Sequence, residues 1–202
     1  MIAQTAGLPA GSLRSDVSGP AVAPSGHLAA ANLSQLADRL CAAPTAITLA
    51  TPVSGLLALA DQSWGTALAP QLRCIDGSSG AGDGLSLAGD STGAGILIVR
   101  NADLILNGGL RWEGLILVTG SEVSVKAGPL STTNIFGSMI INETGNPGLS
   151  AAALEILGNL RASFSRAALS RAGSVIPSSE LPGLYAILPA SIRQDYWRSV
   201  SP

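Results

Sequence analysis

The chain has 202 residues and a formal net charge of −2, which fits one domain with appendages. Only 12% of the residues are charged and 3% are aromatic, whereas 47% are hydrophobic and 24 are glycine. Because the 11 Lys and Arg residues are scattered and form no basic stripe, we expect no nucleic-acid partner. The aliphatic runs are far shorter than the roughly 20 residues of a membrane helix, so no direct membrane span is expected.

Residues 1–69 are predicted to flank the main domain. They open without the basic and apolar regions of a signal peptide, so we expect a signal or anchor segment to be absent from this chain. Apolar residues recur at three- and four-residue spacing over about 28–42 and Pro44 follows them, which predicts an amphipathic helix.

The next segments give weaker patterns. "ITLATPVSGLLALA", which starts at Ile47, predicts a strand followed by a short helix, and "PQLRCIDG", which starts at Pro70, predicts a strand that ends in a turn. Residues 76–94 are rich in Gly, Ser and Asp, which predicts a loop.

A repeated aliphatic phrase follows this loop. "GILIV" begins at Gly95, "GLILV" at Gly114 and "GSMII" at Gly137, with steps of 19 and 23 residues. The first two are followed by a second strand-like limb, "ADLILNG" and "SEVSVKAG", and "ALEILGN" supplies a displaced limb to the third. Repeats of about 20–29 residues with short strands indicate a solenoid, because one coil cannot bury its apolar face alone.

The repeat predicts a mainly β fold, a short right-handed parallel β-helix of about three to five coils over residues 70–175. Near-continuous aliphatic strands suit parallel pairing on both sides, and Asn, Asp and Gly between them suit tight corners. The alternative is a sandwich of ordinary hairpins, because "LILNGGLRW" also fits a hairpin turn.

Stacked coils predict which side chains share a row. We expect one row of Ile96, Leu115 and Ser138 and a second of Ile98, Leu117 and Ile140. A third, outer row is predicted to contain Leu97, Ile116 and Met139. Because this outer row is apolar, we expect the helix at 28–42 or the C-terminal tail to cover it. An exposed row of this kind would be an interaction surface.

Trp112 lies within the repeat. It is interpreted as a plug in the core or at a coil edge, with a sugar-stacking platform as the alternative. It is grouped with the outer row as a candidate for the interaction surface.

The end of the chain changes character again. "LEILGNLRASF", which starts at Leu154, is strand-like, and "SRAALSRAG" predicts a short helix ended by Gly173. Residues 176–202 are predicted to form a helical tail that packs on the solenoid.

Two cysteines, Cys41 and Cys74, allow two interpretations. They are either buried free thiols or one disulfide, and two cysteines do not make a zinc site when His27 is the sole histidine. We favour the disulfide, which implies an oxidising compartment and stabilises the fold by about 3–4 kcal/mol in the chain-entropy model.

Catalytic and metal chemistry finds little support in the sequence. Asp76, Asp83 and Asp90 weakly resemble a calcium-binding repeat but lack its nine-residue period, so we interpret them as solvated loop residues. His27 has no triad partner in the pattern. We expect no catalytic residue, no metal site and no cofactor.

One enzymatic alternative remains. Glu113 and Glu122 could flank a groove on the solenoid, as carboxylates do in sugar-cleaving enzymes, and Arg100 and Arg111 could neutralise an acidic sugar there. A simpler interpretation is that Glu113 and Arg111 form a surface pair on a turn.

The segment "GAGILIVRNADLILNGGLRWEGLILVTG", residues 93–120, resembles the C-terminal domain of PilX-like type IV pilus assembly proteins of bacteria. "NIFGSMII" from Asn134, "LGNLRASFSRAALSRA" from Leu157 and the closing Trp197-Arg198 also fit that family's pattern. Members begin with a hydrophobic anchoring helix, which this chain lacks. The resemblance implies a non-enzymatic pilus or surface-filament protein outside the cytoplasm.

The resemblance also implies the partners, which are other protein subunits, either pilins or further copies of this chain in a homo-oligomer or filament. Two alternatives from other classes stay open. One is a ligand-binding solenoid, of the glycan-binding adhesin or ice-binding type, and the other is the polysaccharide lyase or hydrolase described above.

Overall fold

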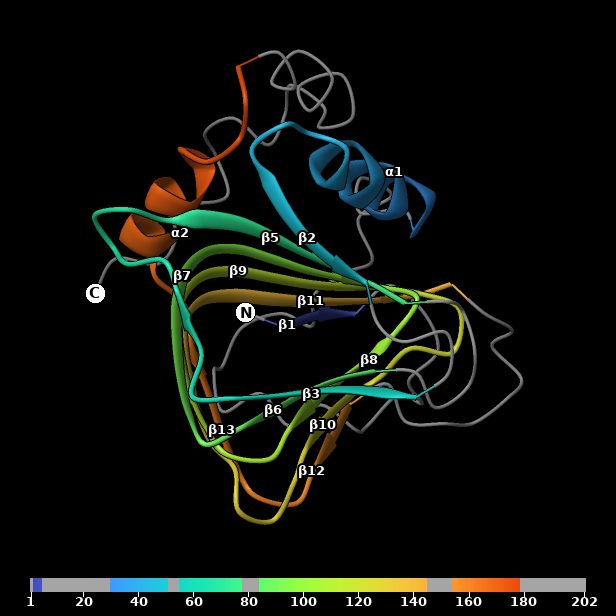
Figure 1. Ribbon diagram of the computed structural model, residues 1–202, viewed down its shortest axis with the longest axis vertical. Coiled ribbons are helices and arrows are strands. Elements are labelled where there is room, and N and C mark those ends of the chain that lie inside the picture. The colour runs from blue at the N-terminus through green and yellow to red at the C-terminus, as the bar shows by residue number, and fades with distance from the viewer. Residues whose placement is uncertain (1, 5–29, 51–54, 78–83, 145–153, 179–202) are drawn as a thin grey trace, which may run out of the picture.

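The computed structural model describes residues 2–4, 30–50, 55–77, 84–144 and 154–178. These residues form a parallel β-solenoid of about four turns with a triangular cross-section (Figure 1). Two helices, α1 (Ala30–Cys41) and α2 (Arg166–Gly173), pack on one side of the triangle. Every strand pair is parallel, which excludes the hairpin sandwich.

The strands make three faces. Their bounds are β1 Ile2–Gln4, β2 Ala46–Ala50, β3 Leu56–Ala60, β4 Ser63–Trp64, β5 Gln71–Asp76, β6 Gly84–Ala88, β7 Asp90–Arg100, β8 Asp103–Leu106, β9 Gly109–Gly120, β10 Val125–Ala127, β11 Thr132–Glu143, β12 Leu154–Ile156 and β13 Asn159–Ser163. The short strands β3, β6, β8, β10 and β12 stack into the short-strand face. The remaining strands belong to one sheet that bends around a corner and supplies the other two faces.

The bend falls at one glycine in each of three long strands. Gly95, Gly114 and Gly137 lie in register across β7, β9 and β11, with φ of +120°, +140° and +143°. A Cβ at Gly114 would collide with the carbonyl oxygen of Gly95, and a Cβ at Gly137 with that of Gly114. Only glycine combines this left-handed conformation with so close a stack.

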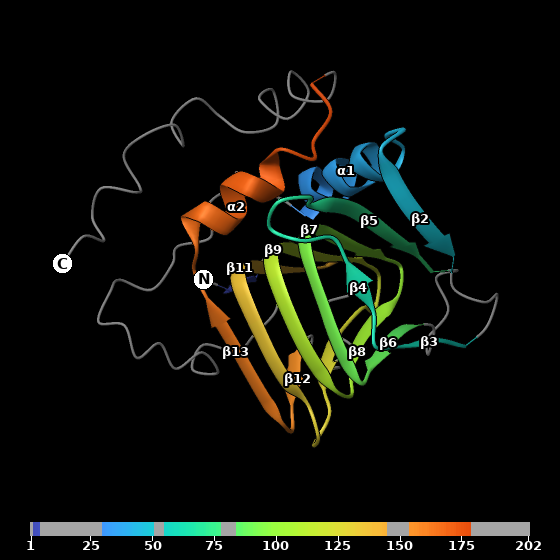
Figure 2. The same ribbon diagram turned by 60° about the vertical axis from the view of Figure 1, so that its left-hand side comes forward.

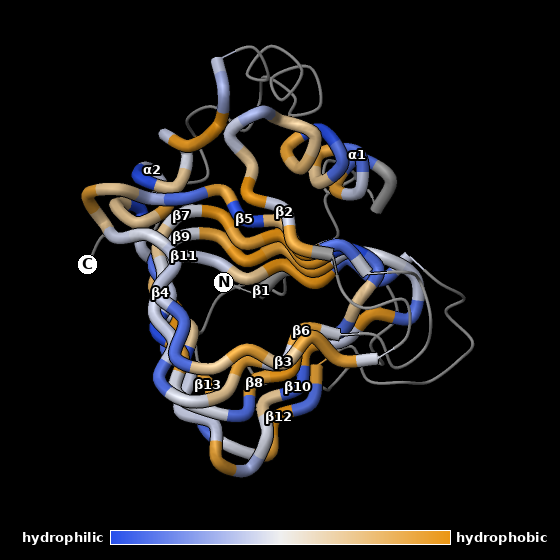
Figure 3. The backbone as a smooth tube through the Cα atoms, viewed as in Figure 1, coloured by the Kyte–Doolittle hydropathy of each residue, from blue (hydrophilic) through white to orange (hydrophobic). Residues whose placement is uncertain are grey.

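The corner divides the bent sheet into two faces. The residues from each glycine onward pair with β2, β5 and β1 and make the helix-covered face, beneath α1 and α2 (Figure 1). The residues before each glycine pair with β4 and β13 and make the exposed face, which stands forward in Figure 2. Figure 3 shows hydrophobic residues along the helix-covered and short-strand faces and a more mixed exposed face.

The predicted rows are confirmed, but their inner and outer sides were assigned wrongly. Ile96 pairs with Leu115, which pairs with Ser138, and the other two rows match in the same way. The predicted outer row points into the solenoid, where Leu97, Ile116 and Met139 are fully buried with Trp112. Their register was right, but which side faces inward depends on the corner, which the aliphatic pattern does not show. These four residues are therefore not a surface.

Trp112 fills the interior as a plug, in agreement with the core interpretation. It pairs with Gly93, and a Cβ at Gly93 would collide with the indole ring. Trp64 lies on the other side of Gly93 in the same row. Large and small residues therefore alternate along the axis, which fills the interior without overlap.

The solenoid begins earlier than residue 70, where the sequence placed its start. β2, β3 and β4 pair in register with β5, β6 and β7, so residues 46–64 form the first coil. The short helix expected after Ile47 is the strand β3, and β6 lies inside the expected Gly-rich loop. The helices at 30–41 and 166–173, the strand at 71–76 and the second limbs are as predicted. His27, Asp83 and most of the predicted tail lie outside the described residues.

Candidate functional site

Helix α1 lies across the strands of the helix-covered face because its residue spacing matches theirs. A helix rises about 1.5 Å per residue, so three or four residues span about 4.5–6 Å, close to the 4.8 Å between strands. Ser34 contacts β9 and β11, Asp38 contacts β7, and Cys41 contacts β5. The helix therefore runs along the solenoid axis, opposite to the order of the coils.

The apolar side of α1 closes a second core outside the solenoid. Leu33, Ala37 and Leu40 are buried at helical spacing, and the last two pack with outward side chains of the strands. This outer cluster also contains Leu72, Cys74, Ile96, Ile98, Leu117 and Ala172. The strands of this face are thus apolar on both sides because both sides are buried.

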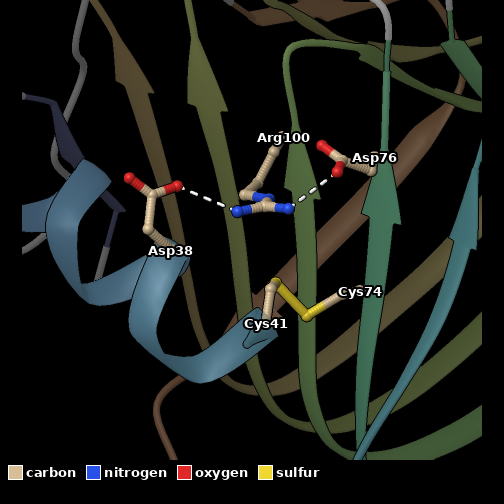
Figure 4. The surroundings of a disulfide bond; sticks show 5 residues. All are labelled: Asp38, Cys41, Cys74, Asp76 and Arg100. Carbon is tan, nitrogen blue, oxygen red and sulfur yellow. Dashed lines mark hydrogen bonds and ion pairs between the residues drawn. A yellow bond between two sulfur atoms is a disulfide. The ribbon is translucent and has the colours of Figure 1, made fainter. Parts of the chain in front are cut away.

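A polar row lies at the edge of this contact. The Arg100 guanidinium donates to Asp38 of α1 at 2.9 Å and to Asp76 of β5 at 2.7 Å (Figure 4). Because the Asp38 side chain is largely exposed, its pair with Arg100 contributes little, about 1 kcal/mol at most. The pair orients α1 more than it stabilises the fold. Asp76 is thus occupied by an arginine and not by a calcium ion.

The row continues with three hydroxyl and amide groups. Asn142 Nδ2 donates to Thr119 Oγ1 at 2.8 Å and to Ser34 Oγ at 3.1 Å. Asn142 is fully buried and Thr119 is nearly so. Buried polar groups require partners, so this cluster fixes where the N-terminal half of α1 sits.

The predicted disulfide between Cys41 and Cys74 is confirmed, and it joins the end of α1 to β5 (Figure 4). The two residues are 33 positions apart in the sequence, and their loop gives about 3–4 kcal/mol in the chain-entropy model. Disulfides persist in oxidising compartments, so this bond points to a location outside the cytoplasm.

The carboxylates of the predicted sugar-cleaving groove do not come together. Glu113 lies on the exposed face and pairs with Arg111 at 3.0 Å and with Arg171 of α2 at 3.1 Å. Glu122 lies in the turn after β9, where its backbone N–H donates to Glu143. Arg100 lies under α1 and does not line a groove with Arg111. Within the described ranges, no three His, Cys, Asp or Glu side chains group around a metal position.

The exposed face carries polar side chains outward and no helix covers most of it (Figure 2). Its central outward row contains Ser63, Thr92, Arg111, Asn134 and Arg161, in register from the first coil to the last. The Arg111 guanidinium also lies 4.7 Å from the centre of the Phe136 ring. The surface is flat and hydrogen-bonding, without a concave site among these residues.

The two ends of the solenoid carry most of the exposed large apolar side chains. Seven such side chains occur among the described residues, and five of them belong to the end coils or follow directly on them: Ile47, Leu56, Ile156, Leu157 and Phe164. Inward residues at the ends are also only partly buried, because no further coil of the described chain covers them. The ends are therefore the apolar surfaces of this molecule.

Arg73 makes the first-coil end unlike the other end. Its neighbours Leu72 and Cys74 point outward under α1, so Arg73 points inward, in the row of Leu97. Its guanidinium lies 5.2 Å from the centre of the buried Trp64 ring, and its Nε donates to Gln71. Desolvation by burial lowers the pKa of Arg73 from its usual value, although an arginine stays charged at neutral pH.

Sequence reasoning did not single out Arg73 or Trp64, although a signal was present. Aligning "QLRCID" with "GILIVR" places Arg73 where the later coils carry Leu97, Ile116 and Met139. A charge at an otherwise aliphatic position of a repeat marks an atypical coil, which is expected at the end of a solenoid.

No protein-family model, no curated protein and no solved structure matches this chain. None of the described helices has the length and apolar character needed to cross a bilayer. The class that the structure itself defines is a disulfide-linked parallel β-solenoid with two helices packed on one face.

Proposed function

We propose that the chain is a non-enzymatic, extracytoplasmic structural protein of a surface filament or pilus. It acts by packing its solenoid ends against other protein subunits. The observation that carries this proposal is the concentration of exposed apolar side chains at the two ends, five of the seven in the described chain.

The physics of solenoids supports this role. Each coil buries its apolar inner row against the next coil, so an end coil leaves that row half covered. The outer strands also present unpaired backbone groups: among the described strands, β2 pairs only with β5, and β3 only with β6. Such edges pair readily with strands of other chains. The disulfide supports a site of action outside the cytoplasm.

The assignment to a pilus is the narrower part of the proposal. It depends on the resemblance of residues 93–120 to PilX-like proteins, which is a pattern of glycines and aliphatic residues. In the structure this pattern serves the corners and the stacked rows, so it supports the fold more strongly than the partner.

Fractionation of surface appendages tests the proposal. The tagged full chain would be produced in piliated bacterial cells, and sheared appendages would be pelleted and probed for the tag. We expect the chain in the pellet, and we expect a Leu56→Asp, Ile156→Asp variant to leave it, because one charge is added at each end. The control is Leu130→Asp, a change at an exposed leucine in a turn far from the ends. A chain that remains in the supernatant, or a control that leaves the pellet equally, would contradict the proposal.

The exposed face favours a second candidate, a glycan-binding solenoid. Its row of Thr92, Arg111, Asn134 and Arg161 supplies hydrogen-bond donors at regular strand spacing, and arginine forks recognise carboxylates. Affinity electrophoresis through polygalacturonate tests it. Retardation that an Arg111→Ala, Arg161→Ala variant loses and an Arg39→Ala variant keeps would favour this candidate, and equal migration would remove it.

A further inference from the structure

The first-coil end has a defined inner lining. Ile47 and Leu49 of β2 and Leu57 and Leu59 of β3 belong to the inward rows, yet all four are only partly buried. Trp64 of β4 completes the lining on the third side. A strand added to this end would therefore bury aliphatic side chains as the next coil of the solenoid does.

Arg73 places a positive charge among these apolar residues. Its recorded contacts are the Trp64 ring and Gln71, and no carboxylate of the described residues forms an ion pair with it. Covering this guanidinium without an anion would bury an uncompensated charge, which is strongly unfavourable. A partner that covers the first-coil end is therefore expected to bring an anion.

The last coil of a second copy does not bring one. Its inward side chains in the described residues are aliphatic: Met139, Ile141, Leu154, Leu160 and Ala162. Head-to-tail stacking of two copies would bury Arg73 against these residues. Inward-pointing charges at a sheet edge are a known device against such self-association.

We propose that the first-coil end accepts a β-strand of a different protein, which pairs with the free edge of β2 and places a carboxylate on Arg73. This inference rests on the proposed function and names the chemistry of its partner. A parallel strand at β2 would continue the rows of Ile47 and Leu49. Its inward residue would lie about 10 Å from the Arg73 backbone, two strand spacings away, within the combined reach of arginine and glutamate side chains.

Two synthetic hexapeptides test the proposal on the full chain. One is N-acetylated, C-amidated Thr-Val-Glu-Val-Thr-Val, and the other has Gln in place of Glu. Calorimetric titration should show the Glu peptide binding at least about tenfold more tightly, since a charge-assisted contact is about twice as strong as a neutral one. The Arg73→Met variant should lose this preference, and Arg73→Lys should keep most of it.

The control variant is Arg39→Met, which removes the same charge from the exposed side of α1 and should keep the preference. Circular dichroism would confirm that each variant is folded. The inference is overturned if neither peptide binds, if both bind equally, or if Arg73→Met still prefers Glu. If it fails while Leu56→Asp, Ile156→Asp still removes the chain from appendages, the proposed function stands and only the strand partner is wrong. If the double variant also stays in the pellet, the role of the ends is wrong as well.

Discussion

The two halves of the long strands β7, β9 and β11 differ sharply, although they are continuous in sequence and share their neighbours. Before Gly95, Gly114 and Gly137, side chains alternate between a buried inner row and a polar outer row. After these glycines, both rows are largely apolar, and helices cover the outer one. One strand can thus serve a solvent-facing sheet and a buried sheet when a corner separates its two parts.

The difference teaches where the rest of the chain must dock. An alternating strand needs burial on one side only, whereas a continuously aliphatic strand needs a cover on both. The helices α1 and α2 pack on the half that needs covering, where the disulfide, the Arg100 pairs and the Asn142 cluster fix α1. The exposed half has no such attachments among the described residues.

The corner glycines should show the largest effect. Gly114→Ala should destabilise the fold by about 4 kcal/mol or more, because its φ is left-handed and the new Cβ meets the Gly95 carbonyl. The control is Gly173→Ala at the end of α2, where a Cβ meets nothing within 4 Å. Urea unfolding would measure both, and an equal loss at the two glycines would argue against the corner.

Loss of the disulfide should come next. A Cys41→Ser, Cys74→Ser variant should lose about 3–4 kcal/mol of unfolding free energy and should release the end of α1. Hydrogen exchange of α1 amides should rise well above that of β9 amides in the exposed half. If α1 exchange does not change, the disulfide does not hold the helix in place.

The aliphatic cover should follow. Leu117→Ala, in the outer cluster under the helices, should cost about 3 kcal/mol through lost burial and a cavity. Leu130→Ala, in an exposed turn, should change stability by no more than about 0.5 kcal/mol. Thermal and urea unfolding of the two variants give the comparison. A small effect at Leu117 would mean that the helices cover this face only loosely.

The smallest contrast compares two asparagines of β11. Asn142 is buried under α1 and bonded to Thr119 and Ser34, so Asn142→Ala should cost about 2 kcal/mol. Asn134, on the exposed face, should tolerate the same change within about 0.5 kcal/mol. Equal losses would show that the two faces differ less than their contacts indicate.

The fold could be predicted largely from the repeat. The glycine-headed phrases at Gly95, Gly114 and Gly137 carry both the period and the corner, so the parallel stacking and the row partners follow from sequence. The inner and outer sides could not be predicted, because "ILIV" is aliphatic at every position. Only the left-handed glycine before it decides which side chains turn inward.

The coils without such phrases were harder to predict. β2 and β3 belong to an end coil, where neighbouring strands on one side alone relax the aliphatic pattern. β6 is short and follows a Gly-rich stretch, so local composition favoured a loop over a strand. The disulfide could be proposed but not chosen over two thiols, because the approach of α1 to β5 is a tertiary contact.

The central claim is that the solenoid ends, and not its exposed face, contact other subunits. Hydrogen–deuterium exchange of the chain in sheared appendages and in free form tests it most directly. The account predicts added protection of the amides at 46–50 and 56–60 in the first coil, with little change at 109–113 and 132–136 of the exposed face. Protection of the exposed face with unchanged first-coil amides would contradict it.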